Sequence, residues 1–248
     1  LEGTQRKLPE LARTRGFPSW QGLIEFNGPS QKHLARTLIE FPCSPLLPLP
    51  FPFFFSFSTK RENQDFHFLK PVESGCIEPN GDIIPKDAVQ FSKLENAPLT
   101  TICKYMFKAY ASPPKAAEME GKSINIDQIL DFIDKNKEND KNFINIVEGC
   151  GGFFSPIAQN KLTADLAESL KLPIILVVKN TLGCINHTLL SIQAIKKLNL
   201  DLKVIVLNNM SENTPLDNYS EISNYTNIPV VKLKYNQELT KEILKYIK

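Results

Sequence analysis

Residues 142–152 read NFINIVEGCGG, an apolar run rich in β-branched residues that ends in a glutamate and a glycine-rich turn. Similar apolar runs occur at residues 173–178 (PIILVV), 203–208 (KVIVLN) and 229–233 (PVVKL), and a shorter one at residues 66–70. Runs of this length and composition are typical of strands buried on both faces of a parallel sheet. The sequence therefore predicts a sheet built from these runs.

Amphipathic stretches separate the apolar runs. They predict helices at about residues 85–94, 124–137, 162–170, 185–198 and from 237 to the end. Strands that alternate with helices are typical of βαβ units, in which helices cover both faces of a parallel sheet. We therefore expect an α/β fold with three layers in a domain that spans residues 66–248.

Residues 1–65 differ from this domain. They hold eight of the eighteen prolines, eight of the sixteen phenylalanines and the only tryptophan, without sustained helical or strand periodicity. Every residue from Ser44 to Ser58 is Ser, Pro, Leu or Phe, all of which have codons that begin with two pyrimidines. We interpret residues 1–65 as a disordered extension that arose from translated non-coding DNA or a gene-model fusion. A Pro-rich extension that docks a partner is the alternative.

Composition excludes several classes of protein. The 248 residues are 42% hydrophobic and carry 29 Lys+Arg against 27 Asp+Glu, which predicts a globular protein and no nucleic-acid partner. Residues 44–58 are apolar, but their four prolines would break a membrane helix, so we expect no membrane association. The five cysteines form no CxxC pair, which disfavours a disulfide framework and a zinc cluster and favours a cytoplasmic location.

The residues that directly follow the predicted strands are small or polar. Ligands of an open parallel sheet bind beyond the carboxyl ends of its strands, so these residues are candidates for one binding rim. A lysine, a carboxylate and glycines that permit close approach suit phosphate and a divalent cation. The rim residues are Lys70, Glu148, Gly149, Gly151, Gly152, Gly183, Asn186, Asn208 and Asn209.

Six motifs occur in the order and spacing of one enzyme family: KPVESG (70–75), DAV (87–89), VEGCGGFFSPI (147–157), DLAESLKLPIILVV (165–178), LGCINHTLLSIQAI (182–195) and VLNN (206–209). Over roughly residues 66–248 the chain resembles dethiobiotin synthetases. The resemblance implies a P-loop NTPase-like fold of the MinD type and a ligase of biotin biosynthesis. Such an enzyme uses ATP, carbon dioxide and Mg²⁺ to close the ureido ring of 7,8-diaminononanoate, which gives dethiobiotin.

The resemblance also assigns roles near the phosphate. Lys70 matches the catalytic lysine, whose ammonium stabilises the carbamate and the transferring phosphoryl group. Ser74 matches a substrate contact, and Asp87 and Glu148 match the residues that hold Mg²⁺. The plainer alternatives are a solvated lysine, a turn-capping serine and, for Asp87, an acid at a helix start. A purely structural role is disfavoured for Glu148, because a carboxylate at the tip of a buried strand needs a partner.

The nucleotide is expected to contact five residues of the matched motifs, of which Asn208 stands where the family reads adenine. These residues are Glu148, Gly149, Gly151, Asn208 and Asn209.

A helix start completes the site that the resemblance implies. The backbone amides of Gly183, Cys184, Ile185 and Asn186 would receive the substrate carboxylate from across the interface of a homodimer. We expect His187, Cys150 and Cys184 to pack or be solvated rather than to react.

The family opens with a strand and the P-loop GTDTxVGKT, and no such sequence precedes KPVESG here. We therefore expect the first strand and the P-loop to be missing and the activity to be impaired. Residues 116–123 (AAEMEGKS) fit a permissive P-loop pattern, but no apolar strand precedes them. Two alternatives are an inactive remnant that dimerises and keeps part of the substrate pocket, and a P-loop ATPase with another substrate. KPVESG together with LGCINH disfavours the latter.

Overall fold

The computed structural model describes residues 36–40, 65–76, 80–81, 83–209, 216–234, 243, 245 and 246, with the backbone alone for residues 36–40. The chain divides into two units, Leu1–Gln31 and Lys32–Lys248, and every described residue belongs to the second. The domain boundary expected at residue 65 stays a prediction, because most residues before it lie outside the described ranges.

The main sheet has six strands, and every pair of neighbours within it is parallel. In spatial order the strands are β10 (Val230–Leu233), β9 (Leu202–Asn208), β8 (Ile174–Lys179), β1 (Arg36–Glu40), β5 (Phe143–Glu148) and β2 (Asp65–Leu69). Five of these strands coincide with the apolar runs of the sequence to within a residue or two. The predicted parallel α/β sheet is therefore confirmed.

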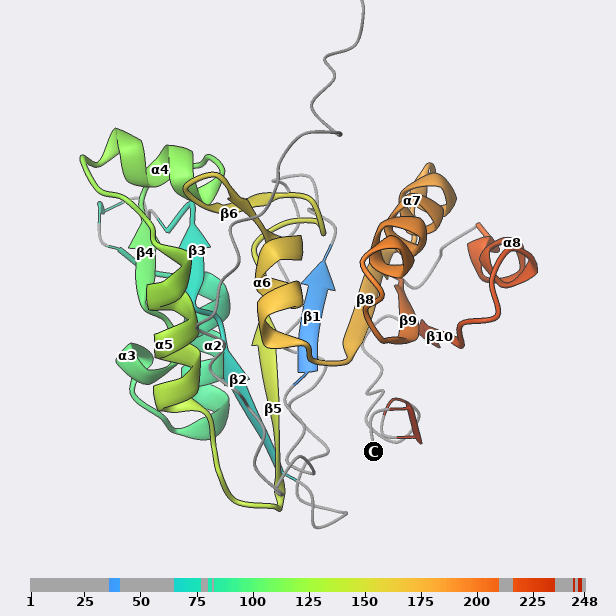
Figure 1. Ribbon diagram of the computed structural model, residues 1–248, viewed down its shortest axis with the longest axis horizontal. Coiled ribbons are helices and arrows are strands. Elements are labelled where there is room, and N and C mark those ends of the chain that lie inside the picture. The colour runs from blue at the N-terminus through green and yellow to red at the C-terminus, as the bar shows by residue number, and fades with distance from the viewer. Residues whose placement is uncertain are drawn as a thin grey trace, which may run out of the picture. The chain divides into compact units, whose positions relative to one another are not determined.

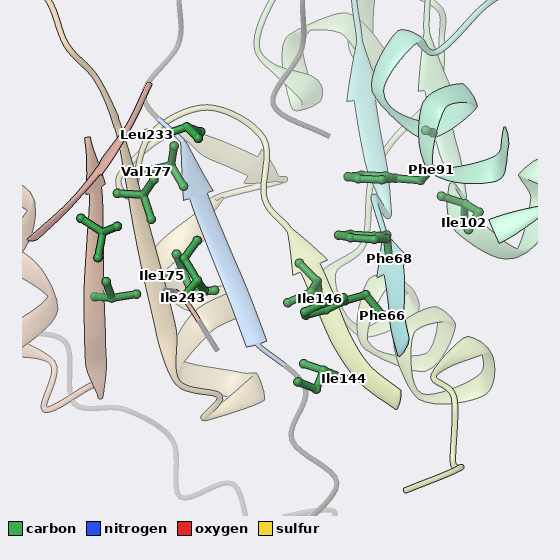
Figure 2. Packing of buried hydrophobic residues seen from close by; sticks show 14 of the residues in the cluster. Phe66, Phe68, Phe91, Ile102, Ile144, Ile146, Ile175, Val177, Leu233 and Ile243 are labelled. Atoms are coloured by element: carbon green, nitrogen blue, oxygen red, sulfur yellow. The ribbon is translucent and has the colours of Figure 1, made fainter. Parts of the chain in front are cut away.

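Helices lie on both faces of this sheet, because both faces of its strands are apolar. On β8, Ile175 and Val177 belong to a core shared with α2 (Lys86–Glu95) and α3 (Leu99–Ile102) (Figure 2). Ile174, Leu176 and Val178 alternate with them and pack with residues of other helices. Those helices are α6 (Thr163–Leu170), α7 (Cys184–Lys197) and α8 (Asn218–Asn224). Helix α5 (Ile126–Asn136) packs in a separate cluster with Leu69 of β2 and Val147 of β5. The result is the expected arrangement of three layers.

Figure 1 shows α2, α3, α4 (Pro113–Met119) and α5 grouped on the β2 side of the sheet, and α7 and α8 on the β8–β10 side. Two small sheets are added, in which β3 (Val72–Ser74) pairs with β4 (Tyr105–Phe107) and β6 (Pro156–Ala158) with β7 (Lys161–Leu162). Of the helix expected after residue 237, residues 243, 245 and 246 are described and are helical. No helix within the described ranges combines the length and apolar character that crossing a bilayer requires.

Strand β1 differs from the expectation that the sheet lacks its first strand. Its Leu38 pairs with Glu148 of β5 on one side and with Ile175 of β8 on the other, so β1 occupies the centre of the sheet (Figure 2). The sequence RTLIE has the β-branched Thr37 and Ile39, but the prolines that follow hide so short a strand from a periodicity analysis. Residues 41–64 lie outside the described ranges, so the absence of a P-loop after β1 stays a prediction.

The second P-loop-like sequence, residues 116–123, begins inside helix α4 rather than after a strand. Ala116 and Ala117 are fully buried on that helix, and Gly121 follows its end. A phosphate-binding loop needs the order strand, loop, helix. The structure therefore agrees with the expectation that this sequence is not a P-loop.

Candidate active site

Lys70 directly follows β2 and lies at the centre of the candidate site. Its side chain is buried, and its ammonium group donates to Glu148 Oε1 in a short contact and to the carbonyl of Gly149 at 2.9 Å. Asp87 Oδ2 lies 3.3 Å from the same nitrogen. Leu69 of β2 pairs with Val147 of β5, so the residues that follow them, Lys70 and Glu148, meet at the carboxyl edge of the sheet. The structure thus brings together four of the residues predicted from the sequence.

Asp87 reaches Lys70 because helix α2 is anchored on β2. Phe91 of α2 stacks on Phe68 of β2, with ring centroids 4.6 Å apart and planes 3° from parallel (Figure 2). Asp87 precedes Phe91 by four residues and therefore lies on the same face of the helix. The aromatic stack fixes the position of the carboxylate one helical turn away.

The charges in this cluster control one another. Burial alone would lower the pKa of Lys70, but the carboxylates of Glu148 and Asp87 outweigh burial and raise it well above its usual range. Burial raises the pKa of Glu148 to about 7, with a further increase from the negative charge of Asp87, although Lys70 acts in the opposite direction. Lys70 therefore stays protonated, and the carboxylates of Glu148 and Asp87 together balance its positive charge.

Glu73 is a residue of this site that sequence reasoning missed. Both of its carboxylate oxygens accept backbone N–H groups at the start of α2, from Asp87 at 3.1 Å and from Ala88 at 3.0 Å. Pro85 at the cap position makes no side-chain hydrogen bond, so Glu73 supplies the cap from a distant strand. Burial and the charge of Asp87 raise the pKa of Glu73 to about 7. The one available signal was a glutamate in a three-residue strand before a helix that begins without its own cap.

Ser74 and Gly75 are held by the segment that follows β4. The Ser74 hydroxyl donates to the carbonyl of Ala111 at 2.7 Å, and the Gly75 amide donates to the carbonyl of Ala109 at 3.0 Å. Gly75 has a φ of +73°, and an added Cβ would lie 2.9 Å from the ring of Tyr110. The positive φ and this close approach both favour glycine at the turn. The hydroxyl oxygen of Ser74 can still accept a hydrogen bond, because it acts only as a donor to Ala111.

The glycine-rich turn after β5 presents backbone rather than side chains to the site. Gly151 has a φ of +77°, and an added Cβ would lie 2.6 Å from Ser155 Oγ, so a larger residue would disrupt the turn. The Gly149 carbonyl already binds the ammonium of Lys70. Burial raises the pKa of the Cys150 thiol in this turn, which fits a packing role rather than a nucleophile.

Helix α7 begins at the second glycine motif. Gly183 caps it with a φ of +90°, and the buried Cys184 is its first residue. A hollow of about 490 Å³ lies between one side of α7, at His187, Leu190, Ser191 and Ala194, and the turn of residues 152–155. Leu182 and Leu190 are 91% and 61% exposed beside it. The hydrogen bonds described for Lys70 and Glu148 do not extend to this helix start.

Asn208 and Asn209 lie at the carboxyl end of β9. The Asn208 side chain is buried, and within the described part of the chain its Oδ1 has no hydrogen-bond partner. The Asn209 Oδ1 accepts from Asn180 at 2.7 Å. These residues lie on the β8–β9 side of β1 and the lysine cluster on the β5–β2 side, so the rim has two separate chemical centres.

The acidic residues at Lys70 fit a hard divalent cation. Glu148 Oε2 is buried and lacks a hydrogen-bond partner among the described residues, whereas the side chain of Asp87 is 26% exposed. No group of three or more His, Cys, Asp or Glu suited to a metal occurs in the described part. Mg²⁺ often takes only one or two carboxylates and completes its shell with water and phosphate oxygens, so two suffice.

Comparison with known proteins agrees with this geometry. A family model described as an AAA domain matches residues 57–242. The ATP-dependent dethiobiotin synthetase BioD of Vesicomyosocius okutanii subsp. Calyptogena okutanii (strain HA) is 38% identical over 169 residues, which are 67% of this chain and 75% of the relative. The enzyme of the same name from Ruthia magnifica subsp. Calyptogena magnifica is 37% identical over 163 residues, 65% of this chain and 73% of the relative. The enzyme of the same name from Lysinibacillus sphaericus (strain C3-41) is 33% identical over 177 residues, which are 69% of this chain and 75% of the relative. The chain therefore belongs to the family of ATP-dependent dethiobiotin synthetases.

Proposed function

We propose that this chain is a cytoplasmic ligase that uses ATP and Mg²⁺ to convert 7,8-diaminononanoate and carbon dioxide into dethiobiotin. The observation that carries the proposal is the buried Lys70 ammonium at the carboxyl edge of the sheet, between Glu148 and Asp87. A fixed cation in a site of low water content stabilises negative charge that develops on a carbamate or on a transferring phosphoryl group. The four described cysteines are free, which is consistent with a reducing compartment.

In the proposed reaction one substrate amine attacks carbon dioxide and forms a carbamate, with loss of a proton. The carbamate oxygen then takes the γ-phosphoryl group of ATP, and ADP is released. The second amine attacks the activated carbonyl carbon, displaces phosphate and loses a proton, which closes the ring. Lys70 stays protonated throughout, because its pKa lies well above its usual range. Mg²⁺ held by Asp87 and Glu148 would supply positive charge near the phosphate oxygens. Ser74 and the backbone of Gly149 and Gly151 would position substrate and phosphate.

Substrate and nucleotide recognition complete the proposal. The backbone amides of Gly183, Cys184, Ile185 and Asn186 would bind the substrate carboxylate, since a helix N-terminus favours an anion. Exposed Leu182, Leu190 and Phe154 beside this helix would be covered in a homodimer, which would bring the helix start to the partner's site. Asn208, whose Oδ1 has no hydrogen-bond partner among the described residues, and Asn209 would contact adenine.

The test is detection of dethiobiotin by mass spectrometry after the full chain is incubated with diaminononanoate, bicarbonate, Mg²⁺ and ATP. Lys70→Ala should lower product formation about 100-fold or more, because it removes a cation that acts on the transition state. Lys104→Ala removes an exposed lysine and is the matched control, with no change expected. A folded wild-type chain that forms no product, or a Lys70→Ala variant that matches it, would contradict the proposal.

A second candidate is the inactive remnant that dimerises and keeps part of the substrate pocket. One observation favours it: the sequence has no glycine between residues 29 and 74, where a P-loop would follow β1. Glycines allow several backbone amides of a P-loop to point at the phosphates of ATP. A segment without glycines is therefore expected to bind these phosphates more weakly. A dimer that binds diaminononanoate but does not hydrolyse ATP would support this candidate against the first.

A further inference from the structure

A buried side chain links strand β3 to the start of helix α2. Glu73 of β3 is 7% exposed, and its two carboxylate oxygens accept from the backbone amides of Asp87 at 3.1 Å and Ala88 at 3.0 Å. These amides belong to the second and third residues of α2, which are the donors that a cap residue normally satisfies. A carboxylate from another element therefore takes the place of a local cap.

Strand β3 holds Glu73 in a fixed position. The backbone of Glu73 pairs with Met106 of β4, and the residues on either side of Glu73 pair with β4 as well. Lys70 lies three residues before Glu73 in the same segment. The segment that carries the Lys70 ammonium thus also caps the helix that carries Asp87.

This link leaves the side chain of Asp87 available to Lys70. An acidic residue in the first turn of a helix is attracted to the unpaired amides at that end. Here Glu73 already accepts from two of these amides, and Asp87 Oδ2 instead lies 3.3 Å from the Lys70 ammonium. Phe91 anchors the same helix one turn later, where it stacks on Phe68 (Figure 2). The turn that carries Asp87 is therefore held at its start and at its end.

We infer that Glu73 is a positioning residue for the divalent cation of the site, because it fixes the backbone from which the Asp87 carboxylate projects. The inference rests on the proposed function, in which Asp87 and Glu148 hold Mg²⁺, and it adds a residue that acts through Asp87 and is not itself a ligand. Without the Glu73 carboxylate, the first turn of α2 would fray and Asp87 would turn toward the free amides of its own helix. Loss of a group that orients a metal ligand typically lowers metal affinity about 10–100-fold.

The test measures the affinity of the full chain for Mn²⁺ alone by electron paramagnetic resonance, which detects the free ion. Mn²⁺ is bound by the same kinds of oxygen ligand as Mg²⁺. Glu73→Ala should weaken Mn²⁺ binding about tenfold. Asp87→Asn alters the proposed ligand itself and should weaken binding at least as much.

A second variant separates position from charge. Glu73→Asp keeps the negative charge, but its side chain is one methylene shorter and should not reach both amides of α2. It should therefore also weaken Mn²⁺ binding, and it replaces Glu73→Ala if that variant does not fold. A Glu73→Asp variant, or a folded Glu73→Ala variant, that binds Mn²⁺ as tightly as wild type would overturn the inference. If Asp87→Asn still weakens binding, the proposed function would stand.

Asn125→Ala is the matched control. Asn125 caps helix α5, where its side chain accepts from the amide of Asp127 at 2.7 Å. Its loss removes a cap of the same kind and should leave Mn²⁺ affinity unchanged, because α5 contributes no residue to the cluster around Lys70. Equal weakening by Asn125→Ala would assign the effect to general destabilisation and overturn the inference. A wild type that binds no Mn²⁺, or an Asp87→Asn variant that binds it equally well, would overturn both the inference and the assignment of Asp87 to Mg²⁺.

Discussion

Buried polar groups are stabilised by ion pairs on one side of the rim and by neutral hydrogen bonds on the other. On the β5–β2 side, Lys70 is paired with the carboxylates of Glu148 and Asp87. On the β8–β9 side, Asn180 and its neighbours are linked by neutral amides. Ion pairs are strong but have little directional demand, whereas amides present donors and acceptors at fixed positions. The charged side therefore holds a fixed positive charge, whereas the amide side holds donors and acceptors at fixed positions.

Removal of the Lys70 cation should have the largest effect on the charged side. Lys70→Met leaves Glu148 buried without its partner and should lower the free energy of unfolding by about 3–5 kcal/mol. The double variant Lys70→Met/Glu148→Gln replaces the buried pair by neutral groups and should recover much of that loss without recovering turnover. Urea unfolding of the three proteins measures the effect. A double variant no more stable than the single one would show that the pair is not the source of the loss.

Strand β1 separates the two sides, so disrupting it should affect both. Leu38→Pro removes a ladder hydrogen bond from the central strand and should cost about 3 kcal/mol or more. Leu38→Val keeps the backbone amide and serves as the control. Denaturant midpoints measure the change, and equal midpoints for Leu38→Pro and wild type would mean that β1 contributes nothing to the sheet.

Loss of the α2 cap on the charged side should have a smaller effect. Glu73→Ala removes both acceptors from the start of α2 and should lower stability by about 1–2 kcal/mol, as for other N-terminal caps. Glu73→Gln keeps one acceptor oxygen and should cost less. Glu118→Ala, on an exposed glutamate whose side chain is 69% accessible, should stay within about 0.5 kcal/mol of wild type. Equal losses for the alanine and glutamine variants would argue against capping as the role of Glu73.

The smallest expected effect separates the pH dependence of the scaffold from that of the site. His67 of β2 contacts Glu95 of α2 at 2.6 Å and the carbonyl of Asn136 at 2.8 Å. Burial lowers its pKa, but the hydrogen bond and charge of Glu95, with a further contribution from Glu138, raise it above 6.5 overall. The protonated form is therefore favoured in the folded state. Its stabilisation is fully present below the unfolded value of 6.5 and is lost as pH rises through the folded-state pKa.

His67→Gln measures this contribution, because glutamine keeps a donor but does not titrate. The difference in unfolding free energy between wild type and His67→Gln should be larger near about pH 5.5 than near about pH 9. A difference that stays constant over this range would contradict the raised pKa.

The lysine cluster was predictable because its members follow neighbouring parallel strands. Lys70 and Glu148 each follow or end an apolar run, and the carboxyl ends of parallel strands share one edge. Glu73 was not predictable, since it caps a helix that begins thirteen residues later, at Lys86, and only the tertiary fold brings the two together. The hydrogen bond from Asn218 of α8 to Asn180 was missed because α8 is a seven-residue helix without clear periodicity. Strand β1 was missed because its five residues, next to a Pro-rich stretch, are too few to show the periodicity of a strand.

The central position of β1 also has a consequence for synthesis of the chain. Its two partners, β5 and β8, lie more than 100 residues later in the sequence, at Phe143–Glu148 and Ile174–Lys179. At ordinary rates of translation, about 5–20 residues per second, β1 leaves the ribosome roughly ten seconds before β8 exists. A strand without its partners presents unpaired backbone groups, which makes it a target for chaperones and a site of premature association. Among the described strands of the sheet, β1 is the one whose partners are made last relative to itself.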